Sequence, residues 1–518
     1  MRKCANKSCS LDNIPTSLIK NETVLQSVIP ALTSLINKSF ATGKFPDSLK
    51  QAQVTPLLKK SGLDVSDLKN YRPVSNIPFL SKVIEKVIAK QLNDHLTRHH
   101  LHDELQSAYK KGCSTETALL RIKSDIDHIL DEGDGVLLVL LDLSAAFDTI
   151  DHSILLQRLH DEVGLRDQAL DWINSYLSQR TQAVHINGSV SQAVALSIGV
   201  PQGSVLGPLL FLIYLLPLRR VIEQYEVARH GFADDTQLYN RLNLRNTSSC
   251  ELQVKTMQDC VADIRIWMMV NKLKLNDSKT EVMVVTKKNH TELVKNIRIK
   301  IGEEIITPKP VAKNLGATLD CVLSMEHQVN AVTRSMYFNI RRIAKIKRHL
   351  TPEACAKAIN ATVTSRLDYH SGLLLGLPDK TIRKLQIAQN NAARLLTGTG
   401  RREHITPVLQ HLHWLPVRQR ITFKIMTTIQ KTLHSATAPT YLKELCTVHE
   451  PRRALRSSAD PWRLQVLRSS NQYGARALQT LGAKLWNDLP AHVRGPMGQS
   501  TFRKHLKTLL FKQAYKLD

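Results

Sequence analysis

The sequence lacks a long uninterrupted apolar run, and this absence excludes a membrane-spanning helix. Its longest apolar stretch, residues 205–218, is broken by Pro208 and Pro217. That stretch is also shorter than the roughly 20 apolar residues that cross a bilayer. Residues 1–4 are not followed by the apolar segment of a secretory signal. We therefore expect an intracellular protein that is not secreted and does not bind a membrane.

Cysteine is sparse, and its spacing excludes two ways of stabilising a fold. The 8 cysteines are scattered along 518 residues, and only Cys4 and Cys9 lie close together in sequence. No histidine or further cysteine completes a zinc-binding set at the usual spacing. We interpret the cysteines as reduced, mostly buried thiols rather than as disulfide partners or zinc ligands. Internal repeats and low-complexity tracts are absent as well.

Acidic residues are few relative to basic ones, but only in one part of the chain. The whole sequence carries 71 Lys and Arg against 45 Asp and Glu, a net charge of +26. Residues 331–518 hold 32 basic and 9 acidic side chains, a net of +23, whereas residues 1–330 hold 39 and 36, a net of +3. Such an excess repels itself unless a polyanion is nearby, so it indicates nucleic acid or an anionic membrane surface as a partner.

Length and periodicity indicate a mixed protein of several domains. At roughly 100–200 residues per domain, the chain is long enough for two to four. Apolar residues at three- and four-residue steps predict an amphipathic helix over residues 80–92. The same reasoning predicts helices over 209–216, 250–273 and most of 320–435, a strand over 279–286, a hairpin over 297–306, and a hairpin with strands 181–186 and 191–198 joined by Asn187-Gly188.

Acidic residues stand at the ends of two further predicted strands. The apolar run at residues 136–141 predicts a strand buried on both faces, and it ends at Asp142. A second apolar segment ends at residues 232–233, which places Asp234 and Asp235 at the tip of a hairpin. Rigid elements therefore present one single and one doubled carboxylate.

Carboxylates gathered in this way need a counter-charge, because unpaired carboxylates repel and raise one another's pKa. Two Mg²⁺ ions relieve the repulsion, since Mg²⁺ prefers hard oxygen ligands and keeps waters and phosphates as its other partners. Two such metals activate an attacking 3′-oxygen and stabilise a leaving pyrophosphate. Each acid alone is also explained as a turn residue or helix cap, so the prediction depends on their combination.

Five segments around these acids follow one another in a distinctive order. They are residues 138–152 (LVLLDLSAAFDTIDH), 198–208 (IGVPQGSVLGP), 232–235 (FADD), 273–281 (LKLNDSKTE) and 313–316 (KNLG). Together they resemble the palm motifs and primer-grip hairpin of reverse transcriptases from non-LTR, LINE-type retrotransposons, including jockey-like elements. Similar finger segments precede them at residues 71–76 and 106–115, and similar C-terminal segments follow at 365–369 and 413–417.

This resemblance implies an RNA-directed DNA polymerase with an α/β (α+β), right-hand fold. The implied divisions are an N-terminal extension over 1–50, a reverse transcriptase domain over 51–320 (fingers to about residue 135, then a palm of antiparallel sheet and helices), a helical thumb over 321–400 and a basic, mostly helical C-terminal region over 401–518. The implied substrates are an RNA template, a DNA primer and deoxynucleoside triphosphates. The implied cofactor is a pair of Mg²⁺ ions, with Mn²⁺ as a substitute, and the expected compartment is the nucleus.

Roles for single residues also follow from the resemblance. It implies Asp142, Asp234 and Asp235 as metal ligands, with the backbone carbonyl of Leu143 sharing in the coordination. Phe147 would lie beneath the sugar of the incoming nucleotide and exclude a 2′-hydroxyl. The alternative explanation of Phe147 is a core aromatic that follows a strand.

Further implied contacts involve the nucleotide and the primer. Gln202 and Gly203 would contact the incoming nucleotide and the template, and Gly203 permits close backbone approach. Lys110 and Lys111 would bind the triphosphate as point charges. Lys279 would lie near the leaving pyrophosphate as a proton donor, or else it is a solvated lysine at a strand edge. Two residues are implied in the primer grip: Leu315 and Gly316.

The sequence departs from the family pattern at three places. Phe232 replaces the more usual Tyr before the paired acids, and Lys110 stands where Arg is commoner, which weakens bidentate phosphate contact. The N-terminal endonuclease of relatives has no counterpart here, so we expect a truncated element or an incomplete gene. The alternative functions are a catalytically silent nucleic-acid-binding remnant and a nuclease with the same two-metal chemistry, although the ordered polymerase motifs oppose the nuclease.

Basic residues recur among the apolar positions of the helices predicted after residue 331. This pattern fits a thumb that holds a template–primer duplex by its phosphates without reading the sequence. Trp414, Trp462 and Trp486 lie among these basic residues. These tryptophans could stack on unpaired bases or pack in a core, and core packing is the simpler explanation.

Overall fold

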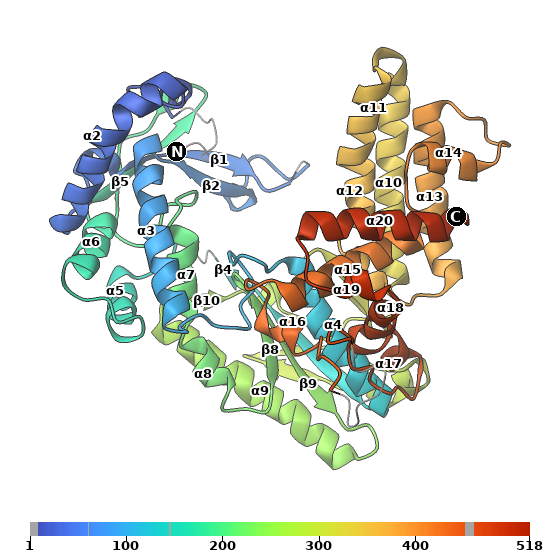
Figure 1. Cartoon of the computed structure of the whole chain (residues 1–518). Coiled ribbons are helices and arrows are strands. Elements are labelled where there is room, and N and C mark those ends of the chain that lie inside the picture. Colours follow the sequence, from blue (N-terminus) through green and yellow to red (C-terminus); the bar gives the residue numbers. More distant parts are fainter. Residues whose placement is uncertain (1–8, 61, 145–146, 451–459, 518) are drawn as a thin grey trace. The chain divides into compact units, whose positions relative to one another are not determined.

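The computed structural model describes residues 9–60, 62–144, 147–450 and 460–517 (Figure 1). The chain divides into two units, each assembled from three separated stretches. Unit 1 comprises Met1–Asp103, Asp142–Tyr225 and Cys260–Asp277, and unit 2 comprises Glu104–Leu141, Glu226–Asp259 and Ser278–Asp518. The chain thus leaves unit 2 between Leu141 and Asp142, where the predicted buried strand ends.

The apolar run forms β3 (Gly135–Leu141), an inner strand of an antiparallel sheet in unit 2. The strand order is β11 (Glu281–Val285), β3, β9 (Asp235–Leu242) and β8 (Ala228–Phe232). From Val136 to Val139 every side chain is fully buried, which confirms a strand covered on both faces. The strand expected over 279–286 is confirmed as β11.

One apolar core joins this sheet to the helices that follow it in unit 2. Helix α4 (Thr115–Glu132) packs on β3 and β8, and its Ile126 belongs to the same buried cluster as Val136. The cluster continues through the C-terminal helices as far as Trp486 and Phe502, both fully buried. Burial of large aromatic side chains contributes strongly to the stability of such a core.

Helices dominate unit 2 after Asp320, as the periodicity predicts (Figure 1). They are α10 (Glu326–Ile346), α11 (Pro352–Ile359), α12 (Ser365–Asp368), α13 (Asp379–Thr397), α14 (Ile405–His411), α15 (Val417–His434), α16 (Thr440–Lys443), α17 (Gln472–Arg476), α18 (Ala483–Asn487), α19 (Ala491–Arg494) and α20 (Gln499–Tyr515). Short 3₁₀ or π turns at Lys347–His349, Asn360–Thr364, Ser371–Leu374 and Leu478–Gly482 connect several of them. The expected α/β (α+β) class is confirmed.

The tryptophans of this helical part serve the core. Trp486 is buried, and its indole N–H donates to the carbonyl of Trp462 at 2.7 Å. Trp414 packs against the same apolar cluster from its edge. Core packing is therefore confirmed for Trp414 and Trp486.

Two small hairpins complete the strands of unit 2. One pairs β12 (Ile299–Ile301) with β13 (Glu304–Ile306), which confirms the hairpin predicted around Gly302. The other pairs β14 (Val311–Asn314) with β15 (Ala317–Asp320). Leu315 and Gly316 form its turn with φ of 47° and 87°, the left-handed pair typical of a tight hairpin.

Unit 1 contains a mixed sheet and its own helices. The sheet is formed by β1 (Gln51–Leu58), β2 (Tyr71–Asn76), β5 (Arg180–Ile186), β6 (Ser189–Val190) and β7 (Val194–Leu196), and β1 runs parallel to β5. The helices are α1 (Thr16–Ile19), α2 (Glu22–Ala41), α3 (Phe79–Arg98), α5 (His152–Asp161), α6 (Asp167–Leu177), α7 (Gly207–Leu215) and α8 (Leu218–Ile222). Helix α9 (Thr247–Val270) has residues in both units. The helices predicted over 80–92, 209–216 and 250–273 are α3, α7 and α9.

The hairpin predicted around Asn187-Gly188 is confirmed at its turn but not along its second strand. Asn187 and Gly188 have φ of 49° and 87°. Of the strand expected over 191–198 only β7 forms, and the pairing beside the turn is made by β6, which lies before residue 191. The hydroxyl of Ser191 accepts from the Val184 N–H at 2.9 Å and takes a bond that a continuous ladder would make. The sequence pattern alone does not distinguish this local interruption from an unbroken strand.

The seven cysteines in the described ranges are free thiols, and four of them are buried. Cys4 lies outside the described residues. Across the part of the chain that the structure describes, none of the helices is both long enough and apolar enough to cross a membrane.

Asp151 caps helix α5 and carries an ion pair within unit 1. Its carboxylate accepts from the N–H groups of Ser153 (3.0 Å) and Ile154 (3.1 Å), and the Lys272 ammonium lies 2.7 Å away. The bond from Lys272, followed by those of the cap, holds the pKa of Asp151 well below its usual range. A depressed folded-state pKa gives stability that is present above the unfolded pKa of about 3.9 and is lost as the pH falls below it.

We predict that Asp151→Asn lowers the free energy of unfolding by about 1 kcal/mol at neutral pH, because the amide keeps much of the cap but loses the ion pair. Urea unfolding at neutral pH and at about pH 3 measures the difference. The gap between parent and variant should shrink at the acidic pH. Asp171→Asn, an exposed aspartate on α6, is the matched control. A gap that stays the same at both pH values would contradict this assignment.

Candidate active site

Asp234 and Asp235 lie at the tip of the β8–β9 hairpin in unit 2, as the sequence predicts. Phe232 pairs with Asp235, so Ala233 and Asp234 form the two-residue turn. Ala233 has a φ of 57°, in the left-handed region that such turns use. Both aspartates are half-buried, so the hairpin presents two carboxylates from a short, constrained turn.

A buried glutamine holds this turn. The side-chain oxygen of Gln106 accepts from the N–H groups of Ala233 (2.9 Å) and Ala108 (3.0 Å). Its amide nitrogen donates to the Ala233 carbonyl at 3.1 Å. One side chain therefore satisfies both backbone polar groups of the residue before Asp234. Gln106 lies in the finger-like segment at residues 106–115, where the sequence alone predicts no role for it.

The backbone around Gln106 is bonded to the same hairpin. Ser107 N–H donates to the Gly231 carbonyl at 2.9 Å, and Gly231 N–H donates to the Leu105 carbonyl at 2.8 Å. A Cβ at Gly231 would lie 2.8 Å from the Gln106 amide nitrogen, so a larger residue would displace that amide. The Ser107 hydroxyl lies 2.8 Å from both the His230 ring and the Tyr441 hydroxyl. The hairpin is thus tied to helix α16.

Asp142 is the first residue of unit 1 after strand β3. Its carbonyl accepts from the Asn276 N–H at 2.9 Å. The next two residues form β4 (Leu143–Ser144), which pairs with β10 (Lys274–Leu275). Leu143, the residue expected to offer a backbone carbonyl to a metal, has a buried side chain. Backbone bonding thus holds the chain on both sides of the Asp142 side chain.

Phe147 packs on Phe211 of helix α7, with ring centroids 5.0 Å apart. Its carbonyl accepts from the Val200 N–H at 3.0 Å, and its side chain is half-buried. These contacts agree with the alternative of a core aromatic. Contact with a nucleotide sugar stays a prediction.

Gln202 and Gly203 lie in a loop pressed against β2. The Gln202 carbonyl accepts from the Ser75 N–H at 2.7 Å, and its side-chain amide donates to the Asp148 carboxylate at 3.3 Å. Gly203 has a φ of 119°, and a Cβ there would lie 2.6 Å from the Ser75 carbonyl oxygen. Gly203 therefore permits a close approach to the backbone of β2 in unit 1, and its contact with nucleotide and template stays a prediction.

A buried carboxylate supports the following residues of this loop. Glu85 on α3 is fully buried, and it accepts from the N–H groups of Val205 (2.6 Å) and Leu206 (3.1 Å). The Ser81 hydroxyl donates to the same side chain at 3.0 Å. Burial raises the pKa of Glu85, and these hydrogen bonds oppose that rise. Glu85 was not singled out from sequence, where it is one of several charged residues in an amphipathic helix.

The predicted basic contacts lie at or near the surface. Lys279 is exposed at the end of the 3₁₀ turn Asp277–Lys279, next to β11. Lys111 is exposed and Lys110 is half-buried. Leu315 and Gly316, the predicted primer-grip residues, form the β14–β15 turn, and the Tyr369 hydroxyl donates to the Leu315 carbonyl at 3.2 Å. Their contacts with substrates stay predictions.

The donor chemistry of the three aspartates suits a hard divalent cation, because all their ligand atoms are carboxylate oxygens. Asp142 belongs to unit 1, whereas Asp234 and Asp235 belong to unit 2. Within the described ranges, no three His, Cys, Asp or Glu side chains form a ready metal-binding group.

Residues 57–319 match the family described as reverse transcriptase (RNA-dependent DNA polymerase). The chain belongs to the reverse transcriptase family. This stretch contains both halves of the predicted carboxylate site, the Gln202–Gly203 loop and the β14–β15 hairpin. The predicted membership is confirmed, and the family generally uses a divalent metal.

Three relatives of this reverse transcriptase come from mobile elements of Drosophila melanogaster. A probable RNA-directed DNA polymerase from transposon BS is 27% identical over 400 residues, covering 76% of this chain and 43% of the relative. One from transposon X-element is 27% identical over 417 residues, covering 77% and 43%. The RNA-directed DNA polymerase from mobile element jockey is 23% identical over 397 residues, covering 75% and 41%. The chain thus spans less than half the length of these relatives.

Solved structures that resemble this reverse transcriptase include two of Candida telomerases. Telomerase from Candida tropicalis with a fragment of telomeric RNA is 12% identical, with a TM-score of 0.38 over 80% of this chain and 67% of that one. Telomerase from Candida albicans with a similar fragment is 10% identical, with a TM-score of 0.36 over 78% and 66%.

We predict that Gln106→Ala releases the turn before Asp234. The substitution leaves the buried polar groups of Ala233 and the Ala108 N–H without partners, at a cost of about 2–4 kcal/mol. Amide hydrogen exchange should show lost protection at Ala233. Gln513→Ala, an exposed glutamine on α20, is the control and should leave that protection intact. Equal protection at Ala233 in parent and Gln106→Ala would contradict the role given to this side chain.

We also predict that Gly203→Ala is more damaging than Gly188→Ala, although both glycines have positive φ. At Gly188 nothing lies within 4 Å of an added Cβ, whereas at Gly203 the Ser75 carbonyl does. We expect Gly203→Ala to cost about 2–4 kcal/mol and Gly188→Ala about 1 kcal/mol. Urea unfolding of the two variants measures this difference. Equal losses of stability in the two variants would show that the close approach of Gly203 to β2 does not restrict the residue at this position.

Proposed function

We propose that this reverse transcriptase is an active RNA-directed DNA polymerase. It extends the 3′-hydroxyl of a DNA primer with deoxynucleotides on an RNA template, and the implied nuclear location belongs to the same proposal. Its relatives are named as RNA-directed DNA polymerases of mobile elements, and this supports the proposed reaction.

The register of β3 against β9 is the observation that carries the proposal. Leu141 is the Cα partner of Thr236 in this antiparallel ladder. Asp142 follows Leu141 and Asp235 precedes Thr236, so each carboxylate belongs to the residue next to this last pair of the ladder. Residues directly opposite one another on such a ladder are close neighbours. The register thus supports one shared carboxylate site.

In this proposal Asp142, Asp234 and Asp235 hold two Mg²⁺ ions, with Mn²⁺ as a substitute and the Leu143 carbonyl as a further ligand. When bound, the ions supply charge that favours ionisation of the primer hydroxyl and the departure of pyrophosphate. The aspartates contribute ligand oxygens from constrained backbone, which limits the reorganisation needed on binding. Gln106 contributes by fixing the backbone of the Ala233–Asp234 turn.

The remaining residues position the substrates in the same proposal. Phe147 lies beneath the nucleotide sugar and excludes a 2′-hydroxyl, while Gln202 and Gly203 contact nucleotide and template. The triphosphate is approached by Lys110, Lys111 and Lys279. Of these, Lys279 lies nearest the leaving pyrophosphate. Leu315 and Gly316 contact the primer. Fingers to about residue 135, a palm to residue 320, a thumb over 321–400 and a basic C-terminal region over 401–518 are the corresponding functional divisions.

We predict that Asp234→Ala abolishes Mg²⁺-dependent extension of a DNA primer on an RNA template. The expected loss of extension activity exceeds about a hundredfold. Substitution of a residue that only contacts a metal ligand already costs about 10–100-fold in metal affinity or activity. Asp259→Ala, an exposed aspartate on α9, is the matched control and should extend as the parent does. Duplex binding at low salt is measured beside extension. A parent that binds the duplex but adds no nucleotide with Mg²⁺ or Mn²⁺ is a binding remnant, and the proposal is then wrong.

A further inference from the structure

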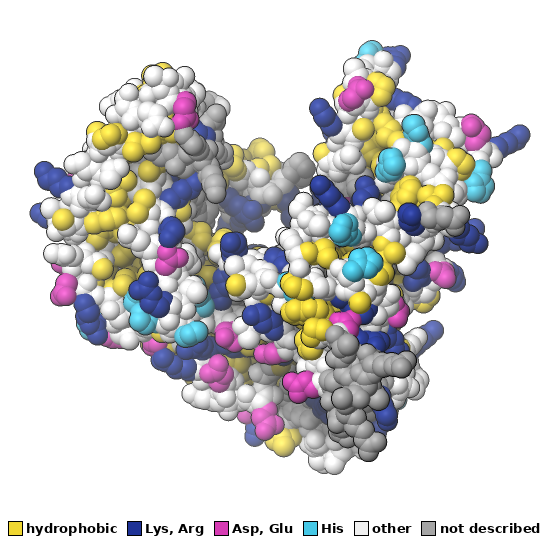
Figure 2. Space-filling model, in the orientation of Figure 1, with side chains coloured by type: hydrophobic (Ala, Val, Ile, Leu, Met, Phe, Trp, Pro, Cys, Tyr) yellow, Lys and Arg dark blue, Asp and Glu magenta, His cyan; other side chains and the backbone are white. Residues whose placement is uncertain are grey.

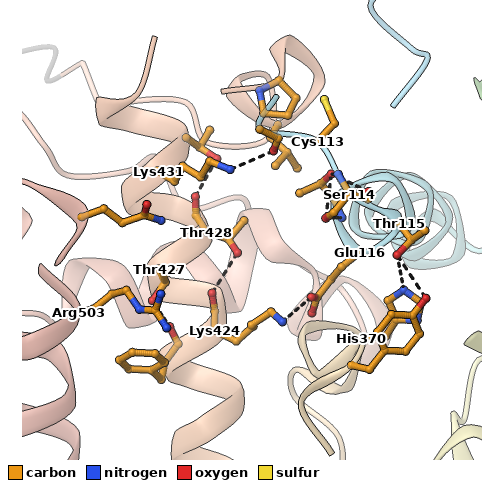
Figure 3. A pocket seen from close by; sticks show the side chains of 18 residues that line it. Cys113, Ser114, Thr115, Glu116, His370, Lys424, Thr427, Thr428, Lys431 and Arg503 are labelled. Atoms are coloured by element: carbon orange, nitrogen blue, oxygen red, sulfur yellow. Dashed lines mark hydrogen bonds and ion pairs between the residues drawn. The ribbon is translucent and has the colours of Figure 1, made fainter. Parts of the chain in front are cut away.

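Unit 2 contains a groove that the reaction just described does not use. One cavity of about 430 Å³ and another of about 450 Å³ share Phe423, Gln499 and Arg503, so they form one continuous depression, the α15–α20 groove. Helix α15 lies along it, and the start of α20 brings Arg503 to one side (Figure 3). The start of α4 and residues Tyr369–His370 line the other side (Figure 3). Most of this lining lies beyond residue 319, where the family match ends.

The lining of the α15–α20 groove is strongly basic. Five cationic side chains belong to it: Lys424, Lys431, Arg503, Lys504 and Lys507. Among the described residues that line it, the sole acid is Glu116, which pairs with Lys424 at 2.7 Å. Burial, together with the neighbouring Lys424, lowers the pKa of His370 to about 4, so this ring is neutral near pH 7.

Three cations of α20 face this groove. Within the part of the chain that the structure describes, Arg503, Lys504 and Lys507 form no ion pair, and the Arg503 guanidinium lies 5.7 Å from the Phe423 ring centroid. Basic side chains also gather over the helical part of unit 2 in the space-filling view (Figure 2). An extended row of unneutralised cations suits an extended polyanion better than a small anion.

A row of hydroxyls lies along the same groove. The hydroxyls of Thr427 and Thr428 donate to the carbonyls four residues earlier, at 2.7 and 3.0 Å (Figure 3). Because each hydroxyl proton is used within α15, the oxygens offer lone pairs to a ligand. Lone pairs repel phosphate oxygens, but they accept from a sugar 2′-hydroxyl, the group that distinguishes RNA from DNA.

Aromatic side chains stand beside these groups. Tyr369 lines the groove with 48% of its surface exposed, and its hydroxyl bonds to the β14–β15 turn. Phe423 is half-buried in the floor. Exposed aromatics between cations are typical of surfaces that bind unpaired bases. Cavities of this volume match small-ligand pockets, so they suit the nucleotides of a single strand rather than a duplex.

We propose that the α15–α20 groove binds an unpaired stretch of RNA. The phosphates lie along Arg503, Lys504 and Lys507, the sugars face Thr427 and Thr428, and a base stacks on Tyr369. This inference rests on the proposed function only in the choice of a polynucleotide as ligand. None of the three proposed metal-binding aspartates is among the residues that line the groove.

The test is binding of a fluorescent, unstructured single-stranded RNA, measured by anisotropy over a range of salt without metal or deoxynucleotides. Arg503→Gln/Lys507→Gln should weaken binding about tenfold and reduce the slope of log affinity against log salt by about 1.4, or 0.7 for each lost phosphate contact. Lys512→Gln is the control, since nine residues place it about half a turn from Arg503 around α20. Thr427→Val should reduce the preference for RNA over DNA of the same sequence.

These readouts are independent of catalysis, so Asp234→Ala should bind the RNA as the parent does even if the polymerase proposal fails. Equal affinity and salt slope in the double variant and the Lys512→Gln control would overturn the inference. A larger effect of the double variant on duplex than on single-stranded RNA would assign the groove to a duplex and also overturn it. Binding of anionic phospholipid vesicles, but not RNA, that depends on Arg503 and Lys507 would make the groove a lipid surface instead.

Discussion

The antiparallel pairing of β3 with β9 is the constraint on which the candidate site depends. Strand β3 is buried on both faces, so a shift of one residue would exchange the side chains packed on its two faces and disrupt the fit of the core. Burial therefore fixes the register, and the register sets Leu141 opposite Thr236. Asp142 follows the last residue of β3, and Asp235 is the first residue of β9. A buried apolar strand thus fixes the backbone beside two of the proposed metal ligands.

Buried polar side chains hold a loop in each of the two units. Gln106 bonds both backbone groups of Ala233, and Glu85 accepts from two successive amides of the loop after Gly203. Both side chains come from segments more than a hundred residues away in sequence from the loops that they hold. Buried hydrogen bonds of this kind are costly to lose, so they keep the turns in one conformation. The basic helices after residue 320 add charge around a separate groove.

The sequence predicts the parts of this fold that follow from local pattern and leaves out those that depend on distant contacts. The apolar run ending at Asp142, the Asp234–Asp235 hairpin and the Asn187-Gly188 turn are confirmed because a few neighbouring residues determine each of them. The prediction of a continuous strand after the Asn187-Gly188 turn is wrong, because the Ser191 hydroxyl takes the place of a backbone bond of the ladder. Gln106 and Glu85 carry no local signal, since their partners lie far away in sequence. Roles of the lysines stay predictions, because surface side chains are not fixed by packing.

Iron-directed cleavage of the backbone tests most directly whether the carboxylates of the two strands share one metal site. Fe²⁺ takes the place of Mg²⁺, and hydroxyl radicals formed at the bound ion cut the nearby chain. If the carboxylates share one metal site, we expect cuts at residues 141–143 and 233–236 together, and loss of both cuts in Asp234→Ala. Cleavage at only one of these segments, or cleavage at both that persists in the variant, would contradict it.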